Sequence, residues 1–118
     1  MAELQYRHIG PPDLFKKDGV WYLTFHGFGK GKKDCQIGLA YGKELAPGKL
    51  TVCPDPILPT SGDPSDPDSG TTGRRDVIFD DKSGCFYMVY EVSTDMVGSD
   101  FGGSHWGHMF ARSKDMKT

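Results

Sequence analysis

One segment of this chain occurs twice, and this repeat constrains the fold more than any other feature. Residues 13–26 read DLFKKDGVWYLTFH, and residues 76–91 read DVIFDDKSGCFYMVYE. A second pair of matching segments follows in the same order, at residues 37–45 and 108–116. The chain therefore uses one structural unit twice, as repeat architectures do. With two extra residues in the second turn, the first pair aligns Asp13 with Asp76, Gly19 with Gly84, Tyr22 with Tyr87, and His26 with Glu91.

Both copies predict short strands joined by turns. In the first copy, Asp18-Gly19 lies between two apolar runs, which is a strong hairpin signal. We expect strands at residues 14–15, 36–41 and 50–53 in the first copy, and at 77–79, 86–91 and 106–112 in the second. The strand after the first turn alternates, which places Trp21, Leu23 and Phe25 on one face and Tyr22, Thr24 and His26 on the other.

These strands predict an all-β fold made of two four-stranded antiparallel units, the second of them incomplete. Repeats of four short strands are typical of β-propeller blades, which pack face to face around an axis. We expect one partial-propeller domain over residues 1–118, with blade one at about 10–53, a long loop at 54–73 and blade two at about 74–116. A sandwich or a Greek-key barrel is the alternative, but neither explains why the same turn and carboxylate recur.

The composition narrows the classes of partner. The net charge of −2 gives no electrostatic reason to expect nucleic acid or an anionic membrane. No apolar run approaches the ~20 residues that cross a bilayer. The first eight residues contain no apolar signal segment, so the localisation is unknown, with the cytoplasm as the default expectation. The three cysteines lack metal-type spacing, and we expect free thiols rather than disulfides or a zinc site.

The openings of both units resemble those of the five-bladed β-propeller glycoside hydrolases of families 43, 32, 62, 68 and 130. The segment PPDLFKKDGVWYL at 11–23 is similar to the Ala-Pro-Asp opening of a family 43 blade, and GRRDVIF at 73–79 resembles the Arg-Asp motif of family 32-like enzymes. The segments GLAYGKEL at 38–45 and ARSKDM at 111–116 are similar to the third strand of such blades. The resemblance spans residues 10–116.

The resembling enzymes need about five blades, and this chain holds two at most. Either the chain is a fragment of a longer gene product, or several copies form a homo-oligomer that completes the propeller. Exposed blade faces and an open sheet edge favour association. In such a ring, the N-terminal segment at residues 4–9 is expected to supply the missing fourth strand of a blade in a neighbouring chain.

The resemblance implies a glycoside hydrolase that cleaves oligosaccharides, with arabinose- or xylose-type plant glycans as the expected substrates. Such cleavage uses two carboxyl groups that flank the bond, and a third can tune the acid by like-charge repulsion. Asp13 is the expected base or modulator, and Asp76 the expected transition-state stabiliser or modulator. Glu91, among Phe86, Tyr87 and Tyr90, is the expected general acid. The alternatives are a turn-capping aspartate, a structural Arg–Asp pair and a solvated strand end, respectively.

The expected substrate-binding residues are Arg75, His26, His105 and Trp106. Arg75 would bind a sugar hydroxyl, and Trp106 beside His105 would offer an indole face to a pyranose ring. The alternatives are that His26 only satisfies a loop and that Trp106 is buried between blades. His108, in the middle of a strand, is interpreted as a core histidine.

No cofactor and no catalytic metal are expected. Asp63, Asp66 and Asp68 lie in a loop that resembles a calcium loop, but Pro64 and Pro67 and the missing closing glutamate favour a solvated acidic loop over a structural calcium ion. Two other functions remain open. One is a carbohydrate-binding or structural propeller fragment without turnover, and the other is a glycoside phosphorylase.

Overall fold

The computed structural model describes residues 6–9, 12–29, 35–61, 63, 65–93 and 106–118, and every regular element in this part of the chain is a β-strand. The all-β prediction is therefore confirmed. The strands are β1 (Tyr6–Ile9), β2 (Asp13–Lys17), β3 (Val20–Gly29), β4 (Cys35–Gly42), β5 (Thr51–Val52), β6 (Thr71–Asp80), β7 (Cys85–Ser93) and β8 (Trp106–Ser113).

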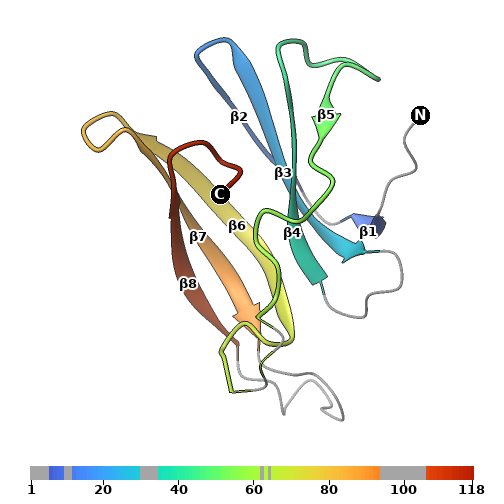
Figure 1. The fold of residues 1–118 in the computed structure, drawn as a ribbon, viewed down its shortest axis with the longest axis vertical. Coiled ribbons are helices and arrows are strands. Elements are labelled where there is room, and N and C mark those ends of the chain that lie inside the picture. The colour runs from blue at the N-terminus through green and yellow to red at the C-terminus, as the bar shows by residue number, and fades with distance from the viewer. Residues whose placement is uncertain (1–5, 10–11, 30–34, 62, 64, 94–105) are drawn as a thin grey trace.

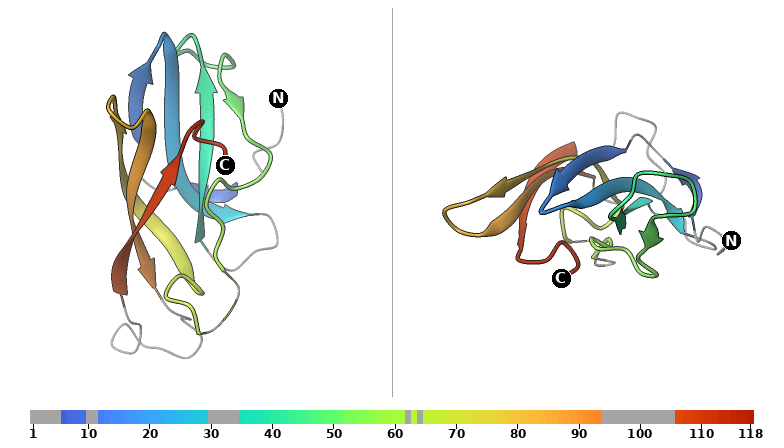
Figure 2. Two further views of the ribbon diagram at one scale, coloured as in Figure 1. Left: turned by 60° about the vertical axis from the view of Figure 1, so that its left-hand side comes forward. Right: turned by 90° about the horizontal axis from the view of Figure 1, so that it is seen from above.

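The strands form two antiparallel sheets, which are two propeller blades (Figure 1). Blade one has the order β2-β3-β4-β5, and blade two has the order β6-β7-β8. A parallel pairing of Cys35 with Thr71 joins the two sheets at one end. Figure 2 shows the sheets as two layers, one against the other.

Both first hairpins turn at a glycine with positive φ. Gly19 has φ 77° and Gly84 has φ 63°, and Asp18 also lies in the left-handed region at 50°. Glycine adopts this conformation without steric cost, and Asp-Gly suits a two-residue hairpin turn. The last ladder pairs are Lys17 with Val20 in blade one and Asp80 with Cys85 in blade two. The second turn is therefore two residues longer, as the sequence alignment predicts.

The cross-strand register is the same in the two blades, which confirms the repeat in three dimensions. Residues that face one another across the strands occupy equivalent positions in the two blades. Across three strands, the row Asp13–Thr24–Leu39 in blade one corresponds to Asp76–Val89–Phe110 in blade two. Across two strands, the pair His26–Ile37 corresponds to Glu91–His108.

Several strands are longer than predicted. β3 continues to Gly29, beyond the predicted alternation that ends at His26, and β6 begins at Thr71, inside the predicted loop at 54–73. In both cases pairing with the adjacent strand extends the ladder, with Phe28 opposite Cys35 and Thr71 opposite Ser93. Tertiary pairing here overrides a turn-rich composition.

The N-terminal strand pairs within its own chain. The sequence analysis assigns residues 4–9 to a blade in a neighbouring chain, but β1 pairs with β3 of its own blade, with His8 opposite Phe28 and Ile9 opposite Gly27. Within one chain the backbone of residues 6–9 is therefore used for pairing with β3, and its contribution to a neighbouring chain stays a prediction.

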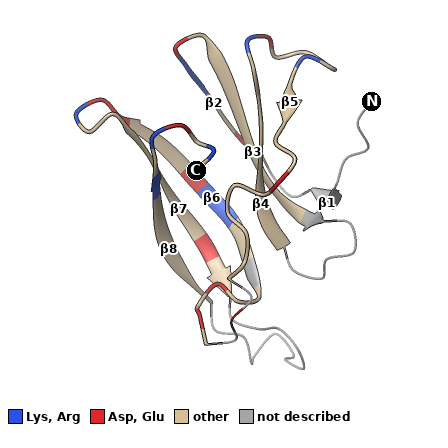
Figure 3. Ribbon diagram, in the orientation of Figure 1, with Lys and Arg blue, Asp and Glu red and all other residues tan. Residues whose placement is uncertain are grey.

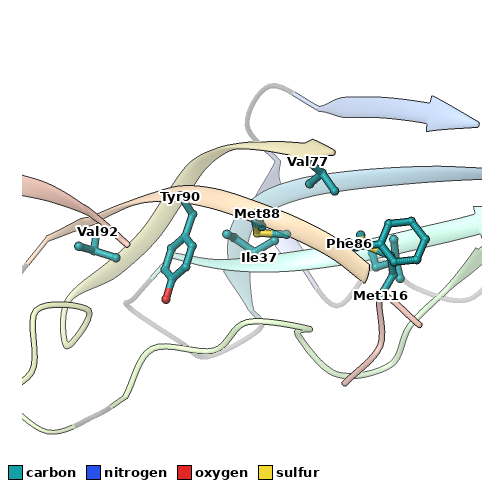
Figure 4. Packing of buried hydrophobic residues seen from close by; sticks show 8 residues of the cluster. Ile37, Val77, Phe86, Met88, Tyr90, Val92 and Met116 are labelled. Carbon is teal, nitrogen blue, oxygen red and sulfur yellow. The ribbon is translucent and has the colours of Figure 1, made fainter. Parts of the chain in front are cut away.

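The main hydrophobic core lies between the two blades (Figure 4). Ile37 and Leu39 of β4 are fully buried in it, and partly buried Phe15 and Tyr22 pack against it from β2 and β3. Phe86 contacts both of these rings, with centroids 5.9 and 5.6 Å apart. The buried members from blade two and the C-terminal segment are Val77, Phe86, Met88, Tyr90, Val92 and Met116.

Each blade has two faces, and the repeat gives them a common orientation. We call the face that carries Asp13 in blade one and Asp76 in blade two the front face, and the opposite side the back face. The front face of blade one packs on the back face of blade two. The back face of blade one carries a smaller cluster, in which Leu23 and Leu50 pack against buried Phe25 and Ala40.

Candidate functional site

Three carboxylates proposed from the sequence lie on the front faces of the two blades. Asp13 begins β2 and Asp76 lies in β6, the first strands of the two blades, at equivalent positions of the register. Glu91 lies near the end of β7, at the position that corresponds to His26 in β3. Figure 3 shows acidic residues on β6 and β7 beside the basic residues of β6.

Asp13 connects the two blades. It is half-buried, and its Oδ2 accepts a hydrogen bond from the backbone amide of Val77 at 3.2 Å. This bond reaches the first strand of the next blade, one residue beyond Asp76. The interpretation of Asp13 as a cap for its own turn is therefore wrong, because its partner lies in the other blade rather than in the local backbone.

Whereas Asp13 of blade one reaches blade two, Arg75 reaches from the back face of blade two to blade one. Its Nε donates to Thr24 Oγ1 at 2.9 Å, its second terminal nitrogen donates to the Thr24 carbonyl, and its first terminal nitrogen lies 2.8 Å from His26 Nδ1. Burial lowers the pKa of Arg75, and the nearby charge of Asp13 opposes that shift. Arg75, Thr24 and His26 thus form an inter-blade clamp.

The clamp decides the protonation state of His26. A guanidinium can only donate hydrogen bonds, so Nδ1 of His26 accepts and the ring proton is on Nε2. Burial lowers the pKa of His26, and the charges of Arg75 and Arg74 lower it further, while Glu91 raises it. His26 is therefore held in its neutral form. The alternative in which it only satisfies a loop is wrong, since it lies in β3 and bonds to the next blade.

Asp76 and Glu91 lie on the front face of blade two, which no other part of the described chain covers. Asp76 is exposed and faces Val89, two residues from Glu91 on the same strand face. Diagonal neighbours of this kind lie ~7–8 Å apart, within reach of long side chains. The pairing of β6 with β7 shifts register between Thr72 and Arg75, directly opposite Glu91. Such bulges re-aim side chains and are common beside active sites.

The surroundings of Glu91 differ in part from the prediction. Tyr87 shares its strand face, but Phe86 and Tyr90 are buried in the inter-blade core on the other side of β7. Strand alternation separates residues that are adjacent in sequence. His108 faces Glu91 across the β7–β8 ladder and is exposed, so its interpretation as a core histidine is wrong.

Two predicted sugar-binding residues are not placed. Trp106 begins β8, but His105 and the side chain of Trp106 lie outside the described part of the chain.

Among the described residues, no group of three histidine, cysteine or acidic side chains is arranged to hold a metal ion. In the acidic loop, Asp63 Oδ1 accepts from the amide and hydroxyl of Ser65 at 2.9 and 2.8 Å, which lowers the pKa of that carboxyl.

Thr24 is a site residue that sequence reasoning missed. It is fully buried and accepts the Arg75 guanidinium through both its hydroxyl and its carbonyl. Alternation correctly places it on one face with His26, but nothing in the sequence links it to an arginine 51 positions later.

The three cysteines are free, as predicted, with Cys35 and Cys85 buried. In the described part of the chain there is no helix long and apolar enough to span a membrane.

Comparison with known proteins assigns the fold. No protein-family model matches the chain, and no curated protein matches it. Solved structures do match. The chain superposes over 97% of its length on 31% of Zg3597, a family 117 glycoside hydrolase of the marine bacterium Zobellia galactanivorans, with a TM-score of 0.71 and 19% identity.

Two further structures agree. The family 43 protein BlXynB of Bacillus licheniformis matches over 99% of this chain and 24% of that one, with a TM-score of 0.64 and 24% identity. BT0996, in a complex named after RGII, matches over 88% of this chain and 32% of that one, with a TM-score of 0.54 and 22% identity. The chain therefore has the fold of β-propeller glycoside hydrolases, as the sequence predicts. It spans about a quarter to a third of their length.

Proposed function

We propose that this chain is part of a glycosidase that cleaves oligosaccharides by carboxylate acid/base catalysis. The main support is the repeated placement of an aspartate on the first strand of each blade. Asp13 and Asp76 occupy equivalent positions on consecutive blades, and Glu91 lies diagonally from Asp76 on the same face. Successive blades that face one axis would direct these carboxylates toward a shared opening.

The proposed roles follow from the surroundings of each carboxylate. Glu91, on the open face beside the bulge of β6, is the proposed general acid. Asp13, oriented by the Val77 amide, is the proposed base or modulator, because a carboxylate with one bonded oxygen can still accept at the other. Asp76, which is exposed and lies diagonally from Glu91, would stabilise the positive charge that develops on the sugar.

Arg75 and His26 would contribute to the site mainly by holding the two blades in register. The clamp that they form with Thr24 fixes β3 against β6, and with it the relative position of Asp13 and Asp76. Direct binding of a sugar hydroxyl by Arg75, and stacking of a pyranose on Trp106, stay predictions. Arabinose- and xylose-type glycans are the substrates to test first.

The test is hydrolysis of 4-nitrophenyl α-L-arabinofuranoside and β-D-xyloside, and of unactivated arabino- and xylo-oligosaccharides. We expect Glu91→Gln to reduce turnover of the oligosaccharides by ~10²–10⁴-fold, the usual contribution of a general acid. The loss should be smaller on the aryl glycosides, because nitrophenol leaves with little protonation. Asp81→Asn, which changes an exposed turn carboxylate, is the matched control and should leave turnover unchanged.

The remaining outcomes separate this proposal from its alternatives. Equal turnover by the wild type and Glu91→Gln would contradict the role of Glu91. Saturable binding of the oligosaccharides without hydrolysis by either protein would support a carbohydrate-binding module instead. Turnover that requires inorganic phosphate would indicate a glycoside phosphorylase.

A further inference from the structure

Apart from Leu45, which lies between β4 and β5, the large exposed apolar side chains of the described residues lie on the two outer faces of the blade pair. Among the described residues, Ile78 and Phe110 are 62% and 80% exposed on the front face of blade two. Leu14 and Val52 are each 40% exposed on the back face of blade one, where Val52 pairs with Ala40. Exposed apolar patches of this kind mark interaction surfaces.

The repeat shows what these side chains contact when their face is covered. Phe110 corresponds in register to Leu39, which is fully buried, and Leu14 corresponds to Val77, which is only 7% exposed. Ile78 corresponds to Phe15, which packs against the core between the blades. The two outer faces therefore carry apolar side chains at several of the positions that form the inter-blade core, although His108 and Arg112 stand where the core has Ile37 and Tyr41.

The same register equivalence predicts which polar contacts the two outer faces could make with each other. The bond from the Val77 amide to Asp13 becomes a bond from the Leu14 amide to Asp76. The cation–π contact of Lys17 with Phe79, at 3.8 Å, becomes a contact between Asp80 and Lys16. The second pair carries opposite charges, so at this position the two outer faces are complementary in charge.

We propose that the front face of blade two binds the back face of blade one of a second copy of this chain. The contact repeats the existing blade-to-blade interface between molecules. Because the two surfaces differ, the association is head to tail, and it closes into a ring when the rotation between copies permits. A second copy would add the Leu14 amide and Lys16 beside Asp76 and Asp80, which the single chain leaves uncovered.

The equivalence also fails at Arg75, and this difference affects the proposed site. Arg75 corresponds to Pro12, so the back face of blade one brings no guanidinium to the position that Arg75 occupies. Thr24 and His26, the partners of Arg75, correspond to Val89 and Glu91. In the assembly, Glu91 would therefore not be clamped by an arginine in the way that His26 is.

The test uses two variants that each remove one face. Phe110→Asp places a carboxylate on the front face of blade two, and Leu14→Asp places one on the back face of blade one. An unpaired carboxylate is costly to bury, so each change should weaken self-association by at least ~100-fold. Lys82→Asp, in the exposed turn between β6 and β7, adds a comparable charge off both faces and is the control. Near-UV circular dichroism checks that each variant is folded.

Light scattering after size exclusion gives the readout. We expect the wild type and Lys82→Asp to assemble at tens of micromolar, and each face variant alone to run as a 13.0 kDa monomer. An equimolar mixture of Phe110→Asp and Leu14→Asp should form a dimer and nothing larger, since one intact pair of faces remains. A monomeric wild type would overturn the proposal and leave these faces to segments from outside the 118 residues. Assembly by Leu14→Asp alone, with no mixed dimer of the two variants in the mixture, would indicate a symmetric front-to-front contact and also overturn it.

Discussion

The two front faces of this molecule have the same strand plan but different surroundings. In blade one, the face is covered by blade two, and its central residues Thr24 and Leu39 are fully buried. In blade two, the equivalent positions hold Val89 and Phe110, and Phe110 is 80% exposed. The same backbone register thus supports a buried polar clamp in one blade and an open apolar face with Asp76 and Glu91 in the other. The difference arises from what covers each face, not from the blade itself.

The largest effect that this comparison predicts concerns Leu39 and its equivalent, Phe110. Leu39→Ala should destabilise the chain by about 2–5 kcal/mol, because it opens a cavity in the core between the blades. Phe110→Ala, measured in dilute monomer, should cost no more than about 0.5 kcal/mol, as is usual for surface substitutions. Urea denaturation of both variants checks this, and equal losses would show that the two faces are not different in the way described.

The second largest predicted effect is a loss of stability when the inter-blade clamp of Arg75, Thr24 and His26 is broken. Arg75→Ala should destabilise the chain by about 2–4 kcal/mol, because it leaves the buried hydroxyl and carbonyl of Thr24 without their donor. Arg74→Ala, at the exposed neighbouring position, should change stability by no more than about 0.5 kcal/mol. Thermal unfolding of the pair measures the contrast. A loss in Arg74→Ala as large as that in Arg75→Ala would contradict the clamp.

The two equivalent aspartates should separate stability from catalysis. Asp13→Ala removes the acceptor of the Val77 amide and should cost about 1–2 kcal/mol. In dilute monomer, Asp76→Ala should leave stability within about 0.5 kcal/mol, because its side chain is exposed there. Denaturant unfolding, with hydrolysis assays of the same samples, compares both properties. If Asp76→Ala destabilises the chain as much as Asp13→Ala, the proposed open position of Asp76 is wrong.

The smallest effect is a pH dependence. The pKa of His26 is lowered in the folded chain, so the unfolded chain binds a proton more readily. The stability from neutral His26 is fully present above its ordinary pKa, near 6.5, and decreases as the pH falls through that value. Stability measured from about pH 7.5 to 5 should therefore fall more steeply in the wild type than in His26→Gln. Parallel curves for the two proteins would mean that Arg75 and His26 do not interact as described.

Much of the fold could be predicted from the sequence because the repeat is written in local signals. The Asp18-Gly19 turn and the alternation through Trp21 to His26 fix the strands and their faces, and the alignment of Asp13 with Asp76 agrees with the observed register. Strand ends are harder to predict. Thr71 and Gly29 extend strands only because Ser93 and β1, respectively, lie beside them.

The site could be predicted only in part, since its contacts cross between blades. The positions of Asp13, Asp76 and Glu91 follow from the repeat, but the partners of Asp13 and Arg75 depend on how one blade packs on the next. Thr24 and the Val77 amide are separated from these residues by 51 and 64 positions in the sequence. No local pattern encodes contacts over such separations.

Carbodiimide cross-linking tests most directly the central claim that both front faces bind the same kind of surface. A mixture of isotopically light and heavy chain would be cross-linked at assembling concentrations and analysed by mass spectrometry of the peptides. We predict a mixed-isotope link between Lys16 and an acidic residue of the front face of blade two, Asp80 or Asp76. If Lys16 forms no intermolecular link while the Lys17–Asp18 pair, 2.7 Å apart, links within the chain, the two front faces do not bind the same kind of surface.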